Sequence, residues 1–258
     1  MAGNASPGDL GSFDTLREIV ARLRRECPWD REQTHFSLRA NLLEECYEAL
    51  EALDQQDPGK LRLELGDLLM QVLLHARIAE DGGDFTLEEV IRGIATKLIH
   101  RHPHVFGEKK ALDKEGVLDQ WDRLKAGEGG GSLLENVPPS LPALAYGQEI
   151  QVRAARQGFD WEGVEGVVEK LDEEVKEVLQ ASTPEERGRE LGDLLFTLVN
   201  MGRKLGLDME GTLRQANRRF LSRFRHMEDL CRQRGLSFAS LSLQEKEALW
   251  QEAKAKSP

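Results

Sequence analysis

Hydrophobic positions recur along most of the chain at the three-to-four-residue spacing of α-helices. Leu, Glu, Arg, Lys and Ala dominate, and β-branched or aromatic residues rarely alternate with polar ones, so the pattern predicts an all-α fold. The first half is expected to form helices at about 12–26, 36–54, 58–80, 86–101 and 113–126. The second half is expected to form helices at about 143–156, 163–180, 184–205, 209–234 and 242–254.

A change in composition separates the two halves. The segment "GEGGGS" at 127–132 is rich in glycine, and "VPPSLP" at 137–142 is rich in proline. Neither composition favours a packed helix, so we interpret residues 127–142 as a linker. This predicts an N-terminal domain at 1–126 and a C-terminal domain at 143–258.

The two halves repeat one another. The letters "ELGDLL" at 64–69 return unchanged at 190–195, and "EECYE" at 44–48 is answered by "EEVKE" at 173–177. Upstream, "PWD" at 28–30 is answered by "DW" at 160–161. The chain is therefore predicted to be an internal duplication of one helical-bundle domain.

Each copy places acidic residues on neighbouring helices. Residues three apart share a helix face, and this spacing relates Glu45 to Glu48, Glu64 to Asp67, Glu174 to Glu177, and Glu190 to Asp193. The stretch "LGDLLMQVLLHA" is apolar nearly all round and is expected to be largely buried. Gathering carboxylates near such a surface is costly without a compensating cation. One glutamate pair alone would be an ordinary solvated face, but the repeated quartet predicts a site for a hard divalent cation, Mg²⁺ with Mn²⁺ as a substitute.

The spacing of these motifs resembles that of a known family. "EECYE" is followed after fifteen residues by "ELGD", and "EEVKE" after twelve by a second "ELGD". This resembles the EExxE…ExxD signature of the all-α nucleoside triphosphate pyrophosphohydrolases. With "CPWDREQTH" and "HRHPHVFGE" in the first half, the tandem arrangement resembles the MazG family over nearly the whole chain after about residue 12.

The resemblance implies a Mg²⁺-dependent hydrolase that cleaves (d)NTPs between the α and β phosphates, releasing a nucleoside monophosphate and pyrophosphate. It also implies a homodimer of helical domains. The implied metal ligands are Glu174, Glu177, Glu190 and Asp193, with Glu45, Glu48, Glu64 and Asp67 as their N-terminal counterparts. Glu173, like Glu44 in the first copy, can reach the metal or hold a water. We expect Glu173 and the four C-terminal ligands to form the catalytic set.

A triphosphate brings negative charge into a carboxylate site, so basic and polar side chains are needed to bind it, and the resemblance adds a tryptophan. The expected substrate-binding residues are Lys170, Asn217, Arg219, Arg223 and Trp250, with Trp250 stacking on the base. Plainer interpretations remain: Lys170 as a helical ion-pair partner of Glu174, the two arginines as surface charges, and Trp250 as a core residue. A stacking tryptophan recognises any base, which favours broad base tolerance.

The two copies differ in these substrate-binding positions. Lys97 and Arg101 occupy the places of the two arginines, but Ala95 stands where Asn217 stands, and no tryptophan follows at the Trp250 position. We therefore expect the C-terminal site to be the main catalyst. The N-terminal half would be a weaker site, or a dimerisation or regulatory module.

Net charge and cysteine content indicate which binding partners and which cellular compartment to expect. The net charge of -11 argues against nucleic acid as a partner. Three widely spaced cysteines, Cys27, Cys46 and Cys231, indicate free thiols in a reducing compartment. No apolar run approaches the roughly 18 residues of a membrane span, and a secretory signal is not evident, so a cytoplasmic protein without membrane contact is expected.

Two alternatives to broad nucleotide hydrolysis remain open from the sequence. One keeps the metal site but narrows the substrate to dUTP, a damaged nucleotide or an alarmone. The other is a non-catalytic helical module that docks a basic partner on its acidic face. A regulatory protein partner is not identifiable from these residues.

Overall fold

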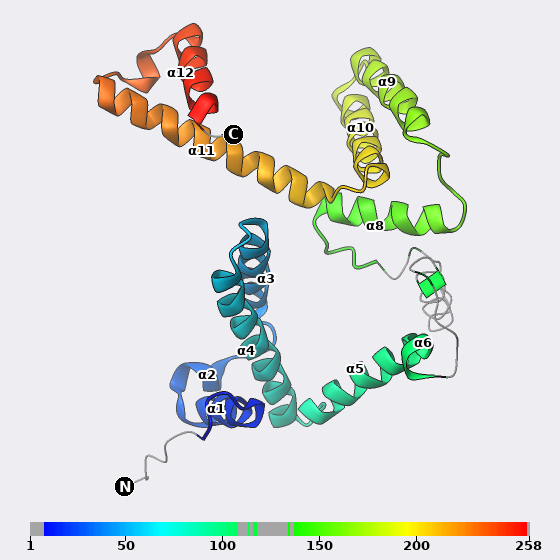
Figure 1. Ribbon diagram of the computed structural model, residues 1–258, viewed down its shortest axis with the longest axis vertical. Coiled ribbons are helices and arrows are strands. Elements are labelled where there is room, and N and C mark those ends of the chain that lie inside the picture. Colours follow the sequence, from blue (N-terminus) through cyan, green and yellow to red (C-terminus); the bar gives the residue numbers. More distant parts are fainter. Residues whose placement is uncertain (1–7, 108–112, 114–115, 118–133, 135–136, 257–258) are drawn as a thin grey trace. The chain divides into compact units, whose positions relative to one another are not determined.

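The computed structural model describes residues 8–107, 113, 116–117, 134 and 137–256. The chain divides into two compact units, Met1–Gly129 and Gly130–Pro258. The described residues form helices and connecting turns without a strand, which confirms the all-α prediction (Figure 1). Most of the predicted helix at 113–126 and all of the glycine-rich segment at 127–132 lie outside this description. The exact domain boundaries stay a prediction.

The first unit follows the predicted order of helices. Its elements are α1 (Phe13–Glu26), α2 (Pro28–Glu32), α3 (Arg39–Asp54), α4 (Pro58–Gly82), α5 (Leu87–Arg101) and α6 (Pro103–Phe106). Helix α3 begins three residues later than expected, because Thr34 and Ser37 form a turn held by reciprocal side-chain hydrogen bonds of 2.9 and 3.1 Å. The pattern did not predict α2 and α6, which are short helices that begin at prolines.

The second unit matches its prediction within two residues at every helix end. Its elements are α8 (Ala143–Arg156), α9 (Val164–Gln180), α10 (Pro184–Lys204), α11 (Met209–Arg234), the 3₁₀ turn η1 (Phe238–Ser240) and α12 (Leu243–Lys256). Helix α10 starts with a capping box: Glu186 N donates to Thr183 Oγ1, and Glu186 Oε2 accepts from Thr183 N. Pro184 follows the cap, so the local sequence fixes where this helix begins.

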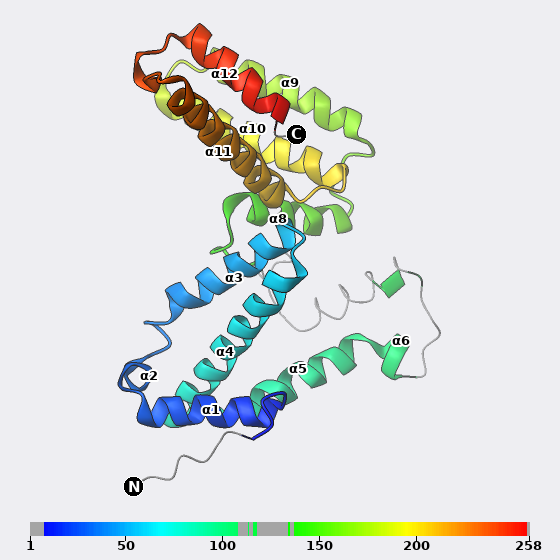
Figure 2. The same cartoon turned by 60° about the vertical axis from the view of Figure 1, so that its left-hand side comes forward.

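Each unit contains one pair of long neighbouring helices. Helices α3 and α4 pack along each other in the first unit, and α9 and α10 do so in the second (Figures 1 and 2). A core cluster of Val20, Leu38, Leu73, Leu74 and Leu87 joins α1, α4 and α5. In the second unit, α12 packs back on α11 around Met227, Leu230, Cys231, Leu249 and Ala253. The two helix pairs carry the acidic motifs.

Residues 65–76 of α4 are not largely buried, so that expectation is wrong, and the repeated motif on α10 is also partly exposed. Leu65 is 54% exposed on α4, and Leu195 is 54% exposed on α10. Each helix buries only the face that packs on its neighbours. These are mainly α3 and α1, with α5, for α4, and mainly α9 and α8, with α11, for α10. As a consequence, Glu64 is buried while Asp67 and Asp193 are exposed. The desolvation argument therefore applies to part of each quartet.

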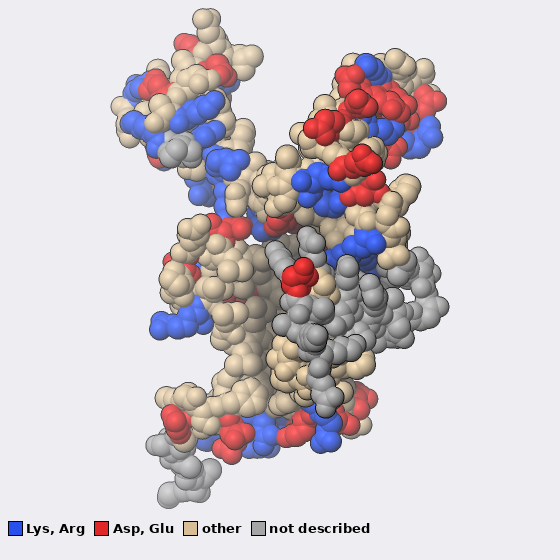
Figure 3. Space-filling view, turned by 45° about the vertical axis from the view of Figure 1, so that its right-hand side comes forward, with Lys and Arg blue, Asp and Glu red and all other residues tan. Residues whose placement is uncertain are grey.

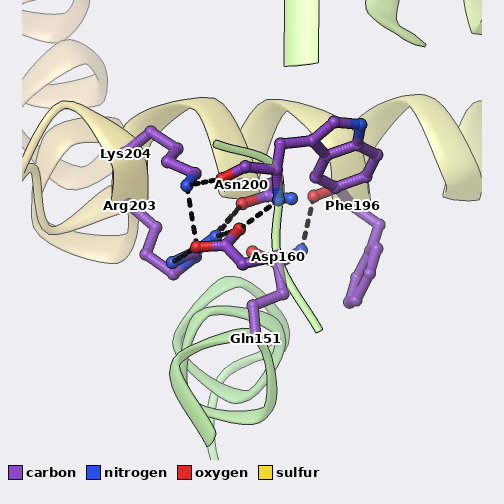
Figure 4. A network of polar contacts seen from close by, with 7 residues as sticks. Gln151, Asp160, Phe196, Asn200, Arg203 and Lys204 are labelled. Carbon is purple, nitrogen blue, oxygen red and sulfur yellow. Dashed lines mark hydrogen bonds and ion pairs between the residues drawn. The ribbon is translucent and has the colours of Figure 1, made fainter. Parts of the chain in front are cut away.

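A polar network fixes the connection between α8 and α9 to the end of α10 (Figure 4). Asp160 accepts from Arg203 Nη1 and Nη2 at 3.1 and 2.5 Å, and its Oδ2 lies 2.7 Å from Lys204 Nζ. Asn200 Oδ1 accepts from Arg203 Nε at 3.1 Å. Burial alone would raise the pKa of Asp160, but the hydrogen bonds from Arg203 and Lys204 outweigh burial and lower it. The network thus orients the entry into α9.

The three cysteines are free thiols, as expected: Cys46 is exposed, Cys27 half-buried and Cys231 buried. Among the helices that the structure describes, none is both long enough and apolar enough to span a bilayer.

Candidate functional site

Three glutamates of the second unit meet between α9 and α10. Glu174 and Glu177 lie on one face of α9, and Glu190 lies on the adjoining face of α10. One carboxylate oxygen of each lies within 4.8 Å of the others. We call these three residues the C-terminal cluster. Figure 3 shows acidic side chains gathered over α9 and α10 on the face that it presents.

Glu174 is the most enclosed member of the C-terminal cluster. Its side chain is only 4% exposed, and Lys170 Nζ lies 2.8 Å from its Oε1. Its second oxygen, Oε2, is buried without a hydrogen-bond partner. A buried carboxylate oxygen normally has a partner, because its desolvation is otherwise uncompensated. This unpartnered oxygen therefore indicates a position for a cation.

Lys170 contacts two neighbouring glutamates at once. Besides Glu174, its Nζ donates to Glu173 Oε1 at 2.7 Å. The hydrogen bonds from Lys170 to Glu173 and then to Glu174 raise the pKa of the lysine. The structure thus realises the ion pair between Lys170 and Glu174 that the sequence offered as the plainer interpretation.

The first unit holds an equivalent set. Glu45 and Glu48 on α3 and Glu64 on α4 form the N-terminal cluster, with one oxygen of each again within 4.8 Å. Burial, followed by the negative charges of Asp67 and Glu48, raises the pKa of Glu45. Burial and the charge of Glu48 likewise raise the pKa of Glu64. These carboxyl groups repel one another at neutral pH.

The two motif aspartates are outside these three-residue sets. Asp67 and Asp193 are both exposed. The charge of Asp67 still reaches Glu45, since it is among the causes of the raised pKa there. The structure therefore brings three of the four predicted ligands together in each copy, and the part played by the aspartates stays a prediction.

Comparisons with known proteins agree with the motif positions. The model of the MazG nucleotide pyrophosphohydrolase domain matches residues 33–106, and that of phosphoribosyl-ATP pyrophosphohydrolase matches residues 150–220. The nucleoside triphosphate pyrophosphohydrolase/pyrophosphatase MazG of Thermotoga maritima is 44% identical over 247 residues, covering 94% of this chain and 95% of that protein. This chain belongs to the MazG family. The nucleoside triphosphate pyrophosphohydrolase of Escherichia coli K12 is 40% identical over 257 residues, covering 95% of this chain and 98% of its own.

A solved structure is also similar to part of this MazG-family chain. The crystal structure of a mazG-related protein from Thermotoga maritima is 33% identical, with a TM-score of 0.40. It covers 43% of this chain and 97% of its own.

The remaining predicted residues lie on α11 and α12. Asn217 and Arg219 are exposed on α11, whereas Arg223 is half-buried and its Cζ lies 5.9 Å from the ring centroid of Trp250. The Trp250 ring also lies 5.2 Å from that of Phe220. The sequence reasoning missed Phe220, although Arg223 and Phe224 follow it after three and four residues in "ANRRFLSRF", a spacing that places each on the helix face of Phe220. The structure thus surrounds Trp250 with an aromatic and cationic group.

The two copies also place their lysines differently, which the sequence reasoning missed. In the first unit Lys60 Nζ lies 2.5 Å from Glu51 Oε2, and Glu51 is outside the N-terminal cluster. Counting from the motifs, the first copy has Asn41 where the second has Lys170, and the second has Glu186 where the first has Lys60. The balancing ammonium groups therefore come from non-equivalent positions in this MazG-family chain.

Both clusters fit a hard divalent cation by their donor chemistry. Their ligand atoms are carboxylate oxygens from two helices, which Mg²⁺ and Mn²⁺ accept and soft metals disfavour. The buried, unpartnered Glu174 Oε2 is the observation that favours the C-terminal cluster.

Proposed function

We propose that this chain hydrolyses ribo- and deoxynucleoside triphosphates between the α and β phosphates, with Mg²⁺ as the natural cation and Mn²⁺ as a substitute. The products are a nucleoside monophosphate and pyrophosphate. The observation that carries the proposal is the C-terminal cluster, with its buried unpartnered oxygen, at the motif of a family whose relatives are named nucleoside triphosphate pyrophosphohydrolases.

The residues have distinct proposed roles. The cation is held by Glu174, Glu177, Glu190 and Asp193, and when bound it supplies positive charge and lowers the pKa of water. Glu173 accepts the proton of the water that attacks the α phosphorus, while the bond from that phosphorus to the bridging oxygen breaks and pyrophosphate leaves. Phosphates and base are bound by Lys170, Asn217, Arg219, Arg223 and Trp250.

The second copy is the proposed main catalyst. Glu174 is buried and Glu177 and Glu190 are half-buried, whereas Glu48 of the first copy is exposed. A more enclosed cluster strengthens electrostatic interactions with a bound cation. The first copy is then a weaker site, or a dimerisation or regulatory module.

A cytoplasmic homodimer is the proposed state. The apolar residues Leu65 and Leu69 on α4, and Leu191 and Leu195 on α10, are exposed within one chain. Apolar surface of this kind favours burial against another protein surface. The free thiols support a reducing compartment.

The direct test is pyrophosphate release from eight ribo- and deoxynucleoside triphosphates with Mg²⁺. We expect release from all eight, within about tenfold of one another, because aromatic stacking tolerates every base. Release from a single nucleotide would replace broad tolerance with the narrow-specificity alternative. If no triphosphate yields pyrophosphate, the hydrolase proposal fails and the binding module replaces it.

The raised carboxyl pKa values predict how pH and metal affect stability together. Glu45 and Glu64 have pKa values above their ordinary 4.5, so the folded unit holds these protons more tightly than the unfolded chain. Metal-free stability should therefore fall as the pH rises through the raised pKa values. A divalent cation binds the ionised form, so its stabilising effect should be larger at pH 7.5 than at pH 5.

Thermal unfolding with EDTA or with Mg²⁺ at the two pH values measures this effect. The matched control is Glu45→Gln/Glu64→Gln, whose response to Mg²⁺ should depend less on pH. An Mg²⁺ stabilisation of the wild type that is equal at pH 5 and pH 7.5 would contradict the prediction.

A further inference from the structure

Lys170 holds an unusual position beside the C-terminal cluster. Its Nζ is 2.8 Å from Glu174 Oε1 and 2.7 Å from Glu173 Oε1, so the ammonium group is already bound to the carboxylate that carries the unpartnered Oε2. Lys170 is about two-thirds buried, with 34% of its side chain exposed. The contact therefore lies partly out of reach of screening by water.

From these contacts we infer that Lys170 is a tethered counter-ion of the C-terminal cluster. It holds Glu174 through Oε1 so that Oε2 faces the cluster, and it neutralises part of the charge that a free divalent cation would otherwise neutralise. The inference rests on the proposed metal site, and it gives Lys170 a positioning role in addition to its proposed contact with the phosphates.

Two opposing electrostatic effects decide what the tether does to metal affinity. The ammonium of Lys170, bound at Oε1, repels a cation bound at Oε2, because the two positive charges then lie only a few ångströms apart on one carboxylate. It also holds Glu174 in one orientation, which favours metal binding. Repulsion between the two positive charges is the larger effect, so the wild-type cluster binds a free cation weakly. A cation bound to a triphosphate is repelled less by Lys170, because the negative charge of the phosphates offsets its positive charge.

The first copy is a natural comparison within the same chain. Asn41 occupies the place of Lys170 there, and the ammonium of Lys60 is bound to Glu51, outside the N-terminal cluster. Among the ion pairs of the described residues, none joins an ammonium group to a glutamate of the N-terminal cluster. Lys60 acts on Glu48 and Glu64 only through its charge, whereas Lys170 contacts Glu174 directly.

The test is a titration of the full-length protein with Mn²⁺ alone at pH 8, with free Mn²⁺ measured by electron paramagnetic resonance. The background Glu45→Gln/Glu48→Gln removes the N-terminal cluster, and Glu174→Gln added to it identifies the C-terminal site. In that background we expect Lys170→Met to tighten Mn²⁺ binding about tenfold, since it removes one nearby positive charge. Lys170→Gln should act in the same direction and replaces Lys170→Met if that variant does not fold.

The matched control is Lys176→Met on the same helix. Lys176 pairs with Asp172 on an exposed face, so its removal should change the Mn²⁺ affinity less than twofold. Damage to the helix would weaken Mn²⁺ binding, which is the opposite of the expected result.

Two outcomes overturn the inference, and they are distinguishable. If Glu174→Gln abolishes a Mn²⁺ site but Lys170→Met leaves its affinity unchanged or lower, the tether is wrong while the proposed metal site stands. If the background protein has no Mn²⁺ site that depends on Glu174, the proposed metal site fails, and the inference fails with it.

Discussion

Glu174→Gln is expected to reduce pyrophosphate release by about 100-fold or more, because a cation that stabilises transition-state charge is worth several kcal/mol. The substitution keeps the size of the side chain and removes the charge from the most enclosed ligand of the C-terminal cluster. Initial rates of pyrophosphate release at saturating nucleotide and Mg²⁺ measure the effect.

The matched variant is Glu45→Gln in the first copy. It makes the same change at the corresponding position of the N-terminal cluster, in a copy that lacks equivalents of Asn217 and Trp250. We expect this variant to retain at least roughly half of the wild-type rate, because the second copy is the proposed main catalyst. Comparable losses in both variants would mean that the two copies share catalysis. An active Glu174→Gln enzyme would exclude Glu174 as an essential ligand.

The second large effect concerns stability: Asp160→Ala should lower the free energy of unfolding of the second unit by about 2–3 kcal/mol, somewhat below the cost of breaking a fully buried ion pair. The carboxylate is 20% exposed and binds both Arg203 and Lys204, so its removal leaves two partly buried cations facing each other. Chemical denaturation followed by circular dichroism at pH 7 measures the loss.

An exposed ion pair of the same unit provides the control for Asp160→Ala. Asp172 is 67% exposed and pairs with Lys176, so Asp172→Ala should cost no more than about 1 kcal/mol. Equal losses for Asp160→Ala and Asp172→Ala would show that the Asp160 network adds nothing beyond an ordinary surface pair.

The lowered pKa of Asp160 adds a pH signature. A depressed carboxyl pKa stabilises the fold above the unfolded value of 3.8, and this stabilisation is lost as the pH falls through the folded value. The difference in stability between wild type and Asp160→Asn should therefore shrink as the pH is lowered below about 4. A difference that grows on acidification would contradict the assigned pKa direction.

Much of the fold was readable from the sequence because helix formation depends on neighbouring residues. The Thr183 and Pro184 start of α10 follows from local capping chemistry, and the duplicated "ELGDLL" indicates two related units. Burial was misjudged for the same reason. An apolar stretch such as that around Leu65 shows that a helix can be buried on every side, but not whether neighbours cover every side.

The chemistry of the site was readable only in part. The spacing of Glu174 and Glu177 predicts a shared helix face, and the second motif supplies Glu190. Which of the acidic residues meet, and that Phe220 stands beside Trp250, depends on how distant helices pack.

The sequence by itself determined the helical class, the duplication, the identity of the carboxylate motifs and the MazG-family membership. All of these depend only on the order of residues and on their local spacing. Only the tertiary structure decided that Glu174 retains a buried unpartnered oxygen, that Asp67 and Asp193 are exposed, and that Asp160 joins Arg203 and Lys204. Desolvation and ion pairing depend on every side chain within a few ångströms. Those neighbours come from segments far apart in the chain, so residue order alone does not identify them.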